Sequence, residues 1–522
     1  MIGGVGTLLL VALLQRGAAT LPPPPPRSHD DSVAEQIRAR VEDDAALVTF
    51  YARRSFRAAW SGEQGPNRLA DELLDALGRA DLEGLDPEDY RAALIRGALD
   101  TVRADAANGR AISPARLAEL DVLLSDAFLL YASHLLRGRV DPETLHPTWD
   151  AARRGADLAT ILQDALESRK IARALQRLIP TDDGYLRLRA ALARERAIAA
   201  HGGWPADLSE RLRLEGDLKD GDSLTVGIQR FQQRHGLPET GVLDSATQAE
   251  LSVSAADRVE QLRINLERWR WLPQDLGRRH VIVNIAAQLL EVVEDGEVVM
   301  RMRVVVGREY KRTPVFSDTV RYIVLNPSWH VPASIAVEEI IPRIRQDSTY
   351  LERFGMHLLA PDDAVEVDPR TVDWSKVTAD NFPYRLRQDP GRLNSLGRMK
   401  FVFPNRYDIY LHDTPARNLF SQPQRDFSHG CIRIERPLDL AAYLMKKTRW
   451  DRRSIQSALD DGTERTMYLA RPTPIHLLYW TAWADADGTI QFRPDINDLD
   501  PPLVDALAAP LRATEEATRN QP

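Results

Sequence analysis

The only cysteine of the 522-residue chain lies beside a histidine in a short polar motif. Cys431 belongs to Ser428-His429-Gly430-Cys431-Ile432-Arg433, and a second histidine, His412, lies 16 residues before Ser428. Sulfur attacks as the thiolate, so a cysteine enzyme needs a nearby imidazole to take the thiol proton. Gly430 would let the backbone pass close to a reacting carbonyl. The spacing predicts two neighbouring strands that bring His412 and Cys431 together as base and nucleophile.

These residues resemble the signature of the L,D-transpeptidases, in which a histidine is followed after a loop by Ser or Thr, His, Gly, Cys, a small apolar residue and Asn or Arg. Two further segments are similar to parts of the large periplasmic members of this family, namely Asn326-Pro327-Ser328-Trp329-His330-Val331-Pro332 and Leu396-Gly397-Arg398-Met399-Lys400-Phe401-Val402-Phe403-Pro404-Asn405. The resemblance covers residues 35 to 500, or nearly the whole chain.

Length and resemblance together predict a multidomain α+β protein with a helical scaffold, a small three-helix peptidoglycan-binding-like module and a β-rich catalytic domain that carries a capping insertion. The predicted parts are a signal peptide or N-terminal anchor at 1–20, a proline-rich linker at 21–34, a helical scaffold at 35–200, the small module at 201–253, a connecting helix at 254–275, the catalytic domain at 276–500 with an insertion at 340–390, and a C-terminal tail at 501–522, polar after Leu511.

Composition indicates an exported protein without a nucleic-acid partner. The net charge is -8 and the arginines are dispersed, so no basic stripe is present. The start of the chain is typical of a signal peptide but lacks a positive n-region, which leaves a misplaced start codon, an uncleaved anchor or a chance apolar end as alternatives. One cysteine cannot form an intrachain disulfide. We expect a periplasmic location, with membrane contact only through the N-terminus.

Apolar residues at helical spacing predict the scaffold, where His134 and His146 are interpreted as packing residues. Residues 202 to 251 describe short helices separated by glycine turns and resemble a peptidoglycan-binding module, although an ordinary helix end explains the same pattern. We expect Phe231, Leu237 and Leu243 to form the core of this module.

Strand patterns begin after a helix at residues 258 to 271. Residues 280–285, 288–293 and 298–306 are rich in Val and Ile, and Asp295-Gly296 is a hairpin signal. Residues 406–411 are expected to form the strand before His412, and 475–483 with 489–493 a terminal hairpin.

The interruption at 340–390 could fold over the site as a lid. Phe382, Tyr384 and Arg385 are candidates for substrate contact, but a core of the lid explains them equally well.

The resulting mechanism makes Cys431 the nucleophile and His412 the general base and then the acid. The resemblance implies that the backbone carbonyl of Asp413 orients His412. Backbone N–H groups at Gly430 and Cys431 are the natural oxyanion donors.

Supporting or substrate-binding roles fall to Ser428, His429, Arg433, Tyr410 and Trp329. Of these, His429 is expected to support the loop or the substrate, and Arg433 either binds a substrate carboxylate or forms a structural ion pair with Glu435 or Asp439.

The family implies a cofactor-free acyl transfer in the cell wall. Cys431 would attack a stem tetrapeptide at the L-centre of its third residue, usually diaminopimelate, and release D-alanine. The acceptor could be an amine of a second stem, giving a 3-3 crosslink, or water, giving an L,D-carboxypeptidase, or a lipoprotein lysine. Acylation by carbapenems is also implied.

Two other classes remain open. A zinc metallopeptidase would use His412, Asp413, His429 and Cys431 as ligands, although their spacing is not that of familiar cell-wall zinc enzymes. A non-catalytic wall-binding scaffold would need none of them for chemistry.

Overall fold

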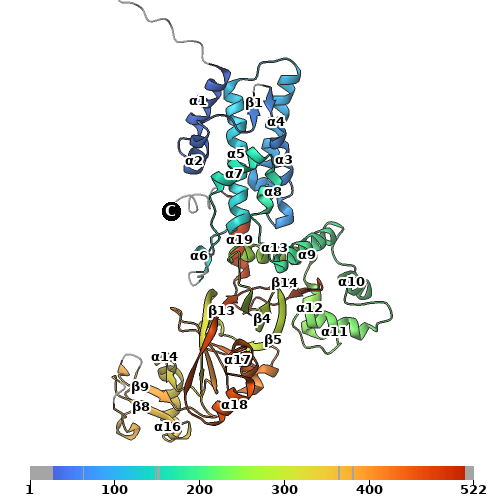
Figure 1. The fold of residues 1–522 in the computed structure, drawn as a ribbon. Coiled ribbons are helices and arrows are strands. Elements are labelled where there is room, and N and C mark those ends of the chain that lie inside the picture. The colour runs from blue at the N-terminus through green and yellow to red at the C-terminus, as the bar shows by residue number, and fades with distance from the viewer. Residues whose placement is uncertain are drawn as a thin grey trace, which may run out of the picture.

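The computed structural model describes residues 28–62, 64–146, 149, 153–362, 365–378 and 381–511. A helical scaffold stands at the top of Figure 1, a β-barrel lies below it, a small helical module sits at one side, and a separate insertion lies beside the barrel. The predicted signal peptide, the first half of the predicted linker (21–27) and the residues after 511 lie outside the described residues. No helix within the described ranges is long and apolar enough to cross a membrane.

The scaffold is built around the long helix α5, which Ser113 caps and Gly138 ends at a positive φ of 87°. Its first helix starts inside the residues predicted as linker. Asp121 of α5 is fully buried and accepts hydrogen bonds from the Ala59 and Trp60 amides at 2.8 Å. The scaffold elements are α1 (His29–Val41), α2 (Ala45–Arg53), β1 (Ser61–Gly62), β2 (Gly65–Pro66), α3 (Arg68–Leu77), α4 (Ala92–Ala107), α5 (Pro114–Arg137), α6 (Pro142–Leu145), α7 (Leu158–Ser168) and α8 (Ile171–Gln176).

The small module consists of three helices, α10 (Leu208–Glu215), α11 (Leu224–Arg234) and α12 (Ser245–Ser252). Phe231 is buried in its core as predicted, but Leu237 is only half-buried and Leu243 is 37 % exposed. The remaining core side chains are Leu212, Leu218 and Ile228. The prediction for Leu243 is therefore wrong, because the chain between α11 and α12 turns its apolar side chains outward.

Two long helices join the scaffold to the barrel. These are α9 (Asp183–Ala200) and α13 (Ala255–Arg270), and they pack against each other. Glu267 and Arg270 of α13 are fully buried and form an ion pair at 2.7 Å. Glu267 also accepts the Val140 N–H of the scaffold at 2.8 Å. This pair therefore joins the two parts of the chain through a buried polar contact.

The predicted catalytic domain contains a closed barrel with the strand order β10-β11-β12-β5-β4-β3-β13-β6. The predicted hairpin at Asp295-Gly296 joins β4 and β5, and both residues have positive φ, 56° and 83°, as a two-residue hairpin turn requires. The strands are β3 (Arg279–Asn284), β4 (Leu289–Glu294), β5 (Glu297–Val305), β6 (Phe316–Leu325), β10 (Met399–Val402), β11 (Leu411–His412), β12 (Ile432–Ile434) and β13 (Arg465–Leu478). Helices α17 (Pro437–Leu444) and α18 (Arg452–Asp460) pack on this barrel (Figure 1).

Three predictions about this domain differ from the structure. Strand β11 is two residues long and does not begin at residue 406. Residues 475–478 belong to β13, which closes the barrel between β3 and β6, and the terminal hairpin is a separate pair, β14 (Ala482–Ala484) with β15 (Ile490–Phe492). In place of a tail from residue 501, helix α19 (Asp500–Ala508) buries Leu503 and Leu507 against the barrel core.

The insertion begins earlier than residue 340 and has a core of its own. Its sheet has the order β7-β9-β8, and Phe382 and Tyr384 pack into its core with ring centroids 5.9 Å apart. This favours the structural interpretation of these two aromatic residues. The elements are β7 (Trp329–Val331), α14 (Ala333–Ile335), a π-helical turn (Ala336–Ile340), α15 (Ile341–Gln346), α16 (Tyr350–Arg353), β8 (Met356–Leu359) and β9 (Arg385–Gln388).

We predict that Glu267→Ala destabilises the protein by about 3 to 5 kcal/mol, because it leaves the buried Arg270 without its counter-charge. Denaturant unfolding followed by tryptophan fluorescence measures the change. The matched control is Glu260→Ala on the same helix, whose ion pair with Arg263 is partly exposed and is expected to contribute about 0.5 kcal/mol. Equal losses in the two variants would contradict the prediction.

Candidate active site

Two short parallel strands place the candidate nucleophile and base on one surface. Strands β11 and β12 pair with Leu411 opposite Ile432 and His412 opposite Arg433. Leu411, Ile432 and Ile434 are fully buried in the barrel core. Because side chains alternate along a strand, His412, Cys431 and Arg433 lie on the outer face. The neighbouring strands predicted from the motif spacing are therefore present.

Ser428 shapes the loop that carries the thiol. Its buried hydroxyl donates to the Cys431 carbonyl at 2.6 Å and accepts from the Gly430 N–H at 3.1 Å. Its backbone N–H donates to the Val306 carbonyl and its own carbonyl accepts from the Arg308 N–H, which ties the loop to the end of β5. Gly430 has a φ of 114°, a conformation that favours glycine. Ser428 therefore positions the nucleophile through hydrogen bonds to the loop.

This geometry changes the expected oxyanion site. The Gly430 N–H is already bound to Ser428, and the Gly430 carbonyl accepts a hydrogen bond from the Thr313 hydroxyl at 2.7 Å. Within the described ranges, the Cys431 N–H has no hydrogen-bond acceptor. Of the two amides predicted as oxyanion donors, only that of Cys431 is free. Thr313, which the sequence analysis did not identify, supports the loop through this hydrogen bond.

A backbone carbonyl orients the His412 ring. Its Nδ1 lies 2.5 Å from the Asp413 carbonyl oxygen, and its side chain is buried. Burial, together with the positive charges of Arg433 and Lys400, lowers the pKa of His412 to about 3, and the Asp413 carbonyl only partly offsets this. The ring is therefore neutral at neutral pH. With Nδ1–H donating to the carbonyl, the Nε2 lone pair is left to accept a proton.

The Asp413 carboxylate faces away from the imidazole. It accepts the Arg398 N–H at 2.9 Å and pairs with Arg417 at 3.4 Å. A Cβ at Gly397, where φ is +63°, would come within 2.5 Å of this carboxylate. The side chain of Asp413 thus fixes the 397–398 turn, while its carbonyl faces the histidine.

Cys431 is a neutral thiol in this environment. Its Sγ lies 3.6 Å from the Asp408 carbonyl oxygen, to which the S–H donates. Burial raises the pKa of Cys431 above its ordinary value, while hydrogen bonds from the Tyr410 amide and hydroxyl and the charge of Lys400 act in the opposite direction. With a raised thiol pKa and a lowered imidazole pKa, the resting pair carries no charge.

Lys400 is a site residue that the motif did not reveal. It lies opposite His412 on β10, and its Nζ is 3.9 Å from the centroid of the Tyr410 ring. Burial lowers the pKa of Lys400, and the neighbouring Cys431 acts to raise it. The only signal in the sequence that could have identified Lys400 is the strand alternation, which places it on the same outward face as Arg398 and Val402. Lys400 is placed to stabilise negative charge on the sulfur.

Tyr410 and Trp329 join the site to the insertion. The Tyr410 ring lies 5.7 Å from the His412 ring at an angle of 63°. Trp329, on the first strand of the insertion, hydrogen-bonds the Tyr410 hydroxyl. Both residues therefore border the reaction centre, one from the barrel and one from the insertion.

His429 belongs to a cluster of polar side chains with Arg308 and Glu339. Its Nε2 lies 2.6 Å from an Arg308 guanidinium nitrogen and 2.7 Å from the Glu339 carboxylate, and Arg308 and Glu339 are 3.2 Å apart. Burial lowers the pKa of His429, which Glu339 opposes and Arg308 reinforces. Because Glu339 belongs to the π-helical turn, this cluster fastens the insertion to the nucleophile loop.

Arg433 forms no ion pair within the described residues, although the charge of Glu339 acts to raise its pKa. Its guanidinium is half-buried, burial lowers its pKa, and the buried Nε has no hydrogen-bond partner in the part of the chain that the structure describes. Glu435 instead accepts the Arg303 N–H at 3.1 Å, and Asp439 pairs with Arg436 and Arg452. The alternative of a structural ion pair between Arg433 and Glu435 or Asp439 is therefore wrong.

The four ligands named for a zinc site do not converge. The Asp413 carboxylate faces Arg398, and His429 faces Glu339. Among the described residues there is no group of three or more His, Cys, Asp or Glu side chains that could hold a metal ion. The geometry gives no support to the zinc hypothesis.

Comparison with known families agrees with this arrangement. Residues 278–452 match a family model described as "L,D-transpeptidase catalytic domain". The chain carries an L,D-transpeptidase catalytic domain. Residues 45–192 match a model described as "Scaffold domain", and residues 210–251 one described as "Putative peptidoglycan binding domain". The predicted fold class, with a helical scaffold, a small peptidoglycan-binding-like module and a β-rich L,D-transpeptidase domain, is confirmed.

A curated relative carries the same family name. A "Putative L,D-transpeptidase" of Haemophilus influenzae (strain ATCC 51907 / DSM 11121 / KW20 / Rd) is 34% identical over 241 residues, which are 46% of this chain and 48% of that protein. The chain thus matches about half the length of this relative. A crystal structure of an L,D-transpeptidase (Yku) from Stackebrandtia nassauensis shares 14% identity, covers 55% of this chain and 89% of that one, and has a TM-score of 0.20, too low to support a statement about the fold.

We predict that alkylation of Cys431 by iodoacetamide rises with pH up to and beyond about pH 9, because the reactive thiolate forms only above the raised thiol pKa. A plateau at neutral pH, as a thiolate–imidazolium pair would give, contradicts this. Lys400→Met should move the curve to still higher pH, because it removes the charge that favours the thiolate. Mass spectrometry of the modified protein follows the rate, and Lys376→Met in the insertion, at an exposed ion-paired lysine, is the control.

Proposed function

We propose that the protein is a peptidoglycan L,D-transpeptidase of the periplasm. The observation that carries the proposal is the single outer face on which the Cys431 thiol lies beside His412, itself oriented by a backbone carbonyl. The small module would hold the enzyme on the wall. Carbapenems would acylate the same thiol.

In the first half-reaction, His412 Nε2 takes the thiol proton as sulfur attacks the carbonyl at the L-centre of the third stem residue. The Cys431 N–H donates to the developing oxyanion, a contact worth roughly 3 kcal/mol in comparable sites. His412 then gives its proton to the amine of the departing D-alanine, and a thioester remains. Lys400 and Tyr410 stabilise the sulfur while it carries charge.

The neutral resting pair fits this order of events. Because the thiol pKa is raised and the imidazole pKa is lowered, proton transfer occurs together with attack and not before the donor binds. Arg433, whose buried Nε has no hydrogen-bond partner among the described residues, is placed to bind a donor carboxylate through its planar guanidinium.

The second half-reaction depends on the acceptor. An amine of a neighbouring stem gives a 3-3 crosslink, which we propose as the main activity. Water would make the enzyme an L,D-carboxypeptidase, and a lipoprotein lysine would make it an anchoring enzyme. A wall-binding scaffold without chemistry is the candidate from another class.

The deciding experiment incubates the purified protein with a disaccharide-tetrapeptide and analyses the products by mass spectrometry. We expect a dimer that has lost one alanine, and no product with Cys431→Ala, since that variant lacks the nucleophile. Tripeptide monomer alone would indicate carboxypeptidase action. Identical, unreacted samples from both proteins would support the scaffold alternative.

We further predict that Arg433→Gln raises KM about tenfold or more while lowering kcat less, because the guanidinium binds the donor and does not touch the reacting carbonyl. Steady-state release of D-alanine gives both constants. The control is Arg465→Gln at the start of β13, where the arginine is exposed and ion-paired with Asp461. A fall in kcat with an unchanged KM would contradict the assignment.

A further inference from the structure

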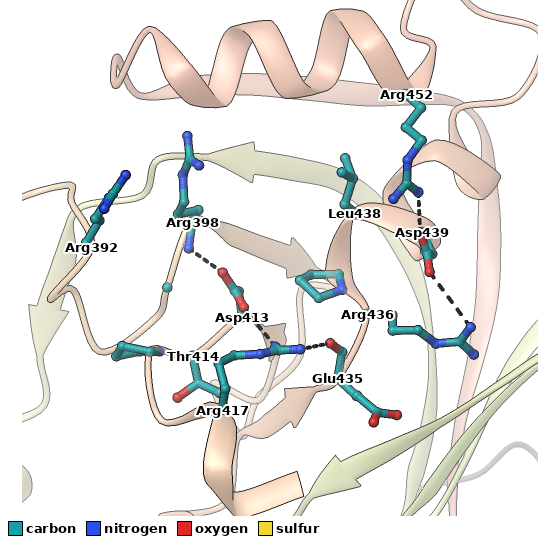
Figure 2. Close-up of a pocket in the computed structure, with 13 residues that line it drawn as sticks. Arg392, Arg398, Asp413, Thr414, Arg417, Glu435, Arg436, Leu438, Asp439 and Arg452 are labelled. Carbon is teal, nitrogen blue, oxygen red and sulfur yellow. Dashed lines mark hydrogen bonds and ion pairs between the residues drawn. The ribbon is translucent and has the colours of Figure 1, made fainter.

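A cavity lies near the reaction centre. It has a volume of about 420 Å³ and contains neither His412 nor Cys431 in its wall. Five arginines face three carboxylates in its lining (Figure 2). The charged lining residues are Arg392, Arg398, Arg417, Arg436 and Arg452, with Asp413, Glu435 and Asp439.

The strand register places this pocket on the same outer face as the thiol. Along β12 the outward side chains follow in the order Cys431, Arg433 and Glu435, and Glu435 is part of the pocket wall. At about 3.3 Å per residue, the pocket wall begins roughly 13 Å from the nucleophile. His412 and Arg433 form the row between them. The pocket thus lies on the same face as the reaction centre, beyond His412 and Arg433.

Two of its arginines are available to a ligand. Arg392 is exposed and has no ion pair or side-chain hydrogen bond within the described ranges, and Arg398 has only the largely exposed Asp460 at 3.2 Å. Arg417 instead donates to the carbonyls of Ile434 and Glu435. Figure 2 shows Arg392 and Arg398 on one side of the cavity, away from Arg436 and Arg452.

The helix at the opposite wall adds to this preference for anions. Helix α17 starts at Pro437, and its first turn has no side-chain cap. Leu438 and Asp439 of that turn line the pocket. Free amides at a helix start carry partial positive charge, so they reinforce the arginines.

The side from which the amines approach His412 decides which substrate reaches this pocket. His412 must protonate the departing amine and later deprotonate the incoming one, so both amines approach from the histidine side. In the second half-reaction the amine nitrogen forms a bond to the thioester carbonyl, its proton passes to His412 Nε2, the C–S bond breaks, and the sulfur recovers that proton. A substrate that delivers an amine beside His412 extends toward the arginine pocket.

We infer that the pocket is the acceptor subsite, in which Arg392 and Arg398 bind a carboxylate of the amine-bearing peptide stem. This assignment rests on the proposed function. It makes an anionic peptide, and not water or a lipoprotein lysine, the preferred acceptor, because a carboxylate a few bonds from the amine can pair with Arg392 and with Arg398, whose ion pair with Asp460 is largely exposed.

The test uses the full-length protein with a disaccharide-tetrapeptide donor and a disaccharide-tripeptide acceptor, whose carboxylates are either free or amidated. Rates of dimer formation and of D-alanine release are measured separately by mass spectrometry. In the double variant Arg392→Gln with Arg398→Gln, we expect dimer formation with the free acceptor to fall about tenfold or more. The amidated acceptor should react equally with both proteins, and the first-turnover burst of D-alanine release, which precedes acceptor attack, should stay within about twofold.

A second measurement distinguishes a failure of the proposed function from a failure of the acceptor-subsite assignment. Calorimetric binding of the disaccharide-tripeptide to Cys431→Ala, with and without the arginine substitutions, reports on the pocket without turnover. Absence of D-alanine release from the unmodified enzyme would refute the proposed function, whereas binding that is unchanged in the arginine variants would refute the acceptor subsite. Equal losses with free and amidated acceptors would also refute it.

The matched control for the double variant is Arg278→Gln, which removes an exposed, ion-paired arginine on the same barrel far from the pocket in the chain. Dimer formation in this variant is expected to equal that of the unmodified enzyme. A comparable loss there would show that the effect follows from surface charge in general and would refute the assignment to Arg392 and Arg398.

Discussion

The parallel pairing of β11 with β12 is the constraint on which the rest of the site depends. Leu411 and Ile432 are opposite each other and fully buried, and this burial excludes any other register, because a slip by one residue would exchange the buried and exposed sets of side chains. The apolar core that stabilises the barrel therefore also sets the position of His412 relative to Cys431. Closure of the barrel removes free edges at which such short strands could separate.

Backbone groups rather than charged side chains orient the reacting residues. The Asp413 carbonyl holds His412, the Asp408 carbonyl receives the thiol, and Thr313 supports the loop from below. Glu339 links the insertion to the loop through His429. The thiol and the imidazole stay uncharged at rest, and a protonated thiol also resists oxidation, which proceeds through the thiolate.

Local sequence signals predicted the parts of this protein that local chemistry determines. The Asp295-Gly296 turn needs two residues of positive φ, and the motif around Cys431 contains its own glycine and serine, so both could be recognised in the sequence. Contacts between distant segments could not. Lys400 joins the site only because β10 pairs with β11, and α19 is ordered by burial against the barrel, which its polar surroundings in the sequence conceal. Leu243 fits a helical core pattern, but it is 37 % exposed in the folded module.

The position of α19 also affects how the protein can be made. Arg139 of the scaffold donates to the carbonyls of Ala506 and Ala509 in and after this helix, and Asp500 at its start pairs with Arg268 of α13 at 2.6 Å. A segment near residue 505 thus completes an interface whose other half was synthesised more than 350 residues earlier. During vectorial synthesis, the scaffold emerges first and has to wait for α19. The two halves of the enzyme consequently become one body only when nearly all of the chain is present.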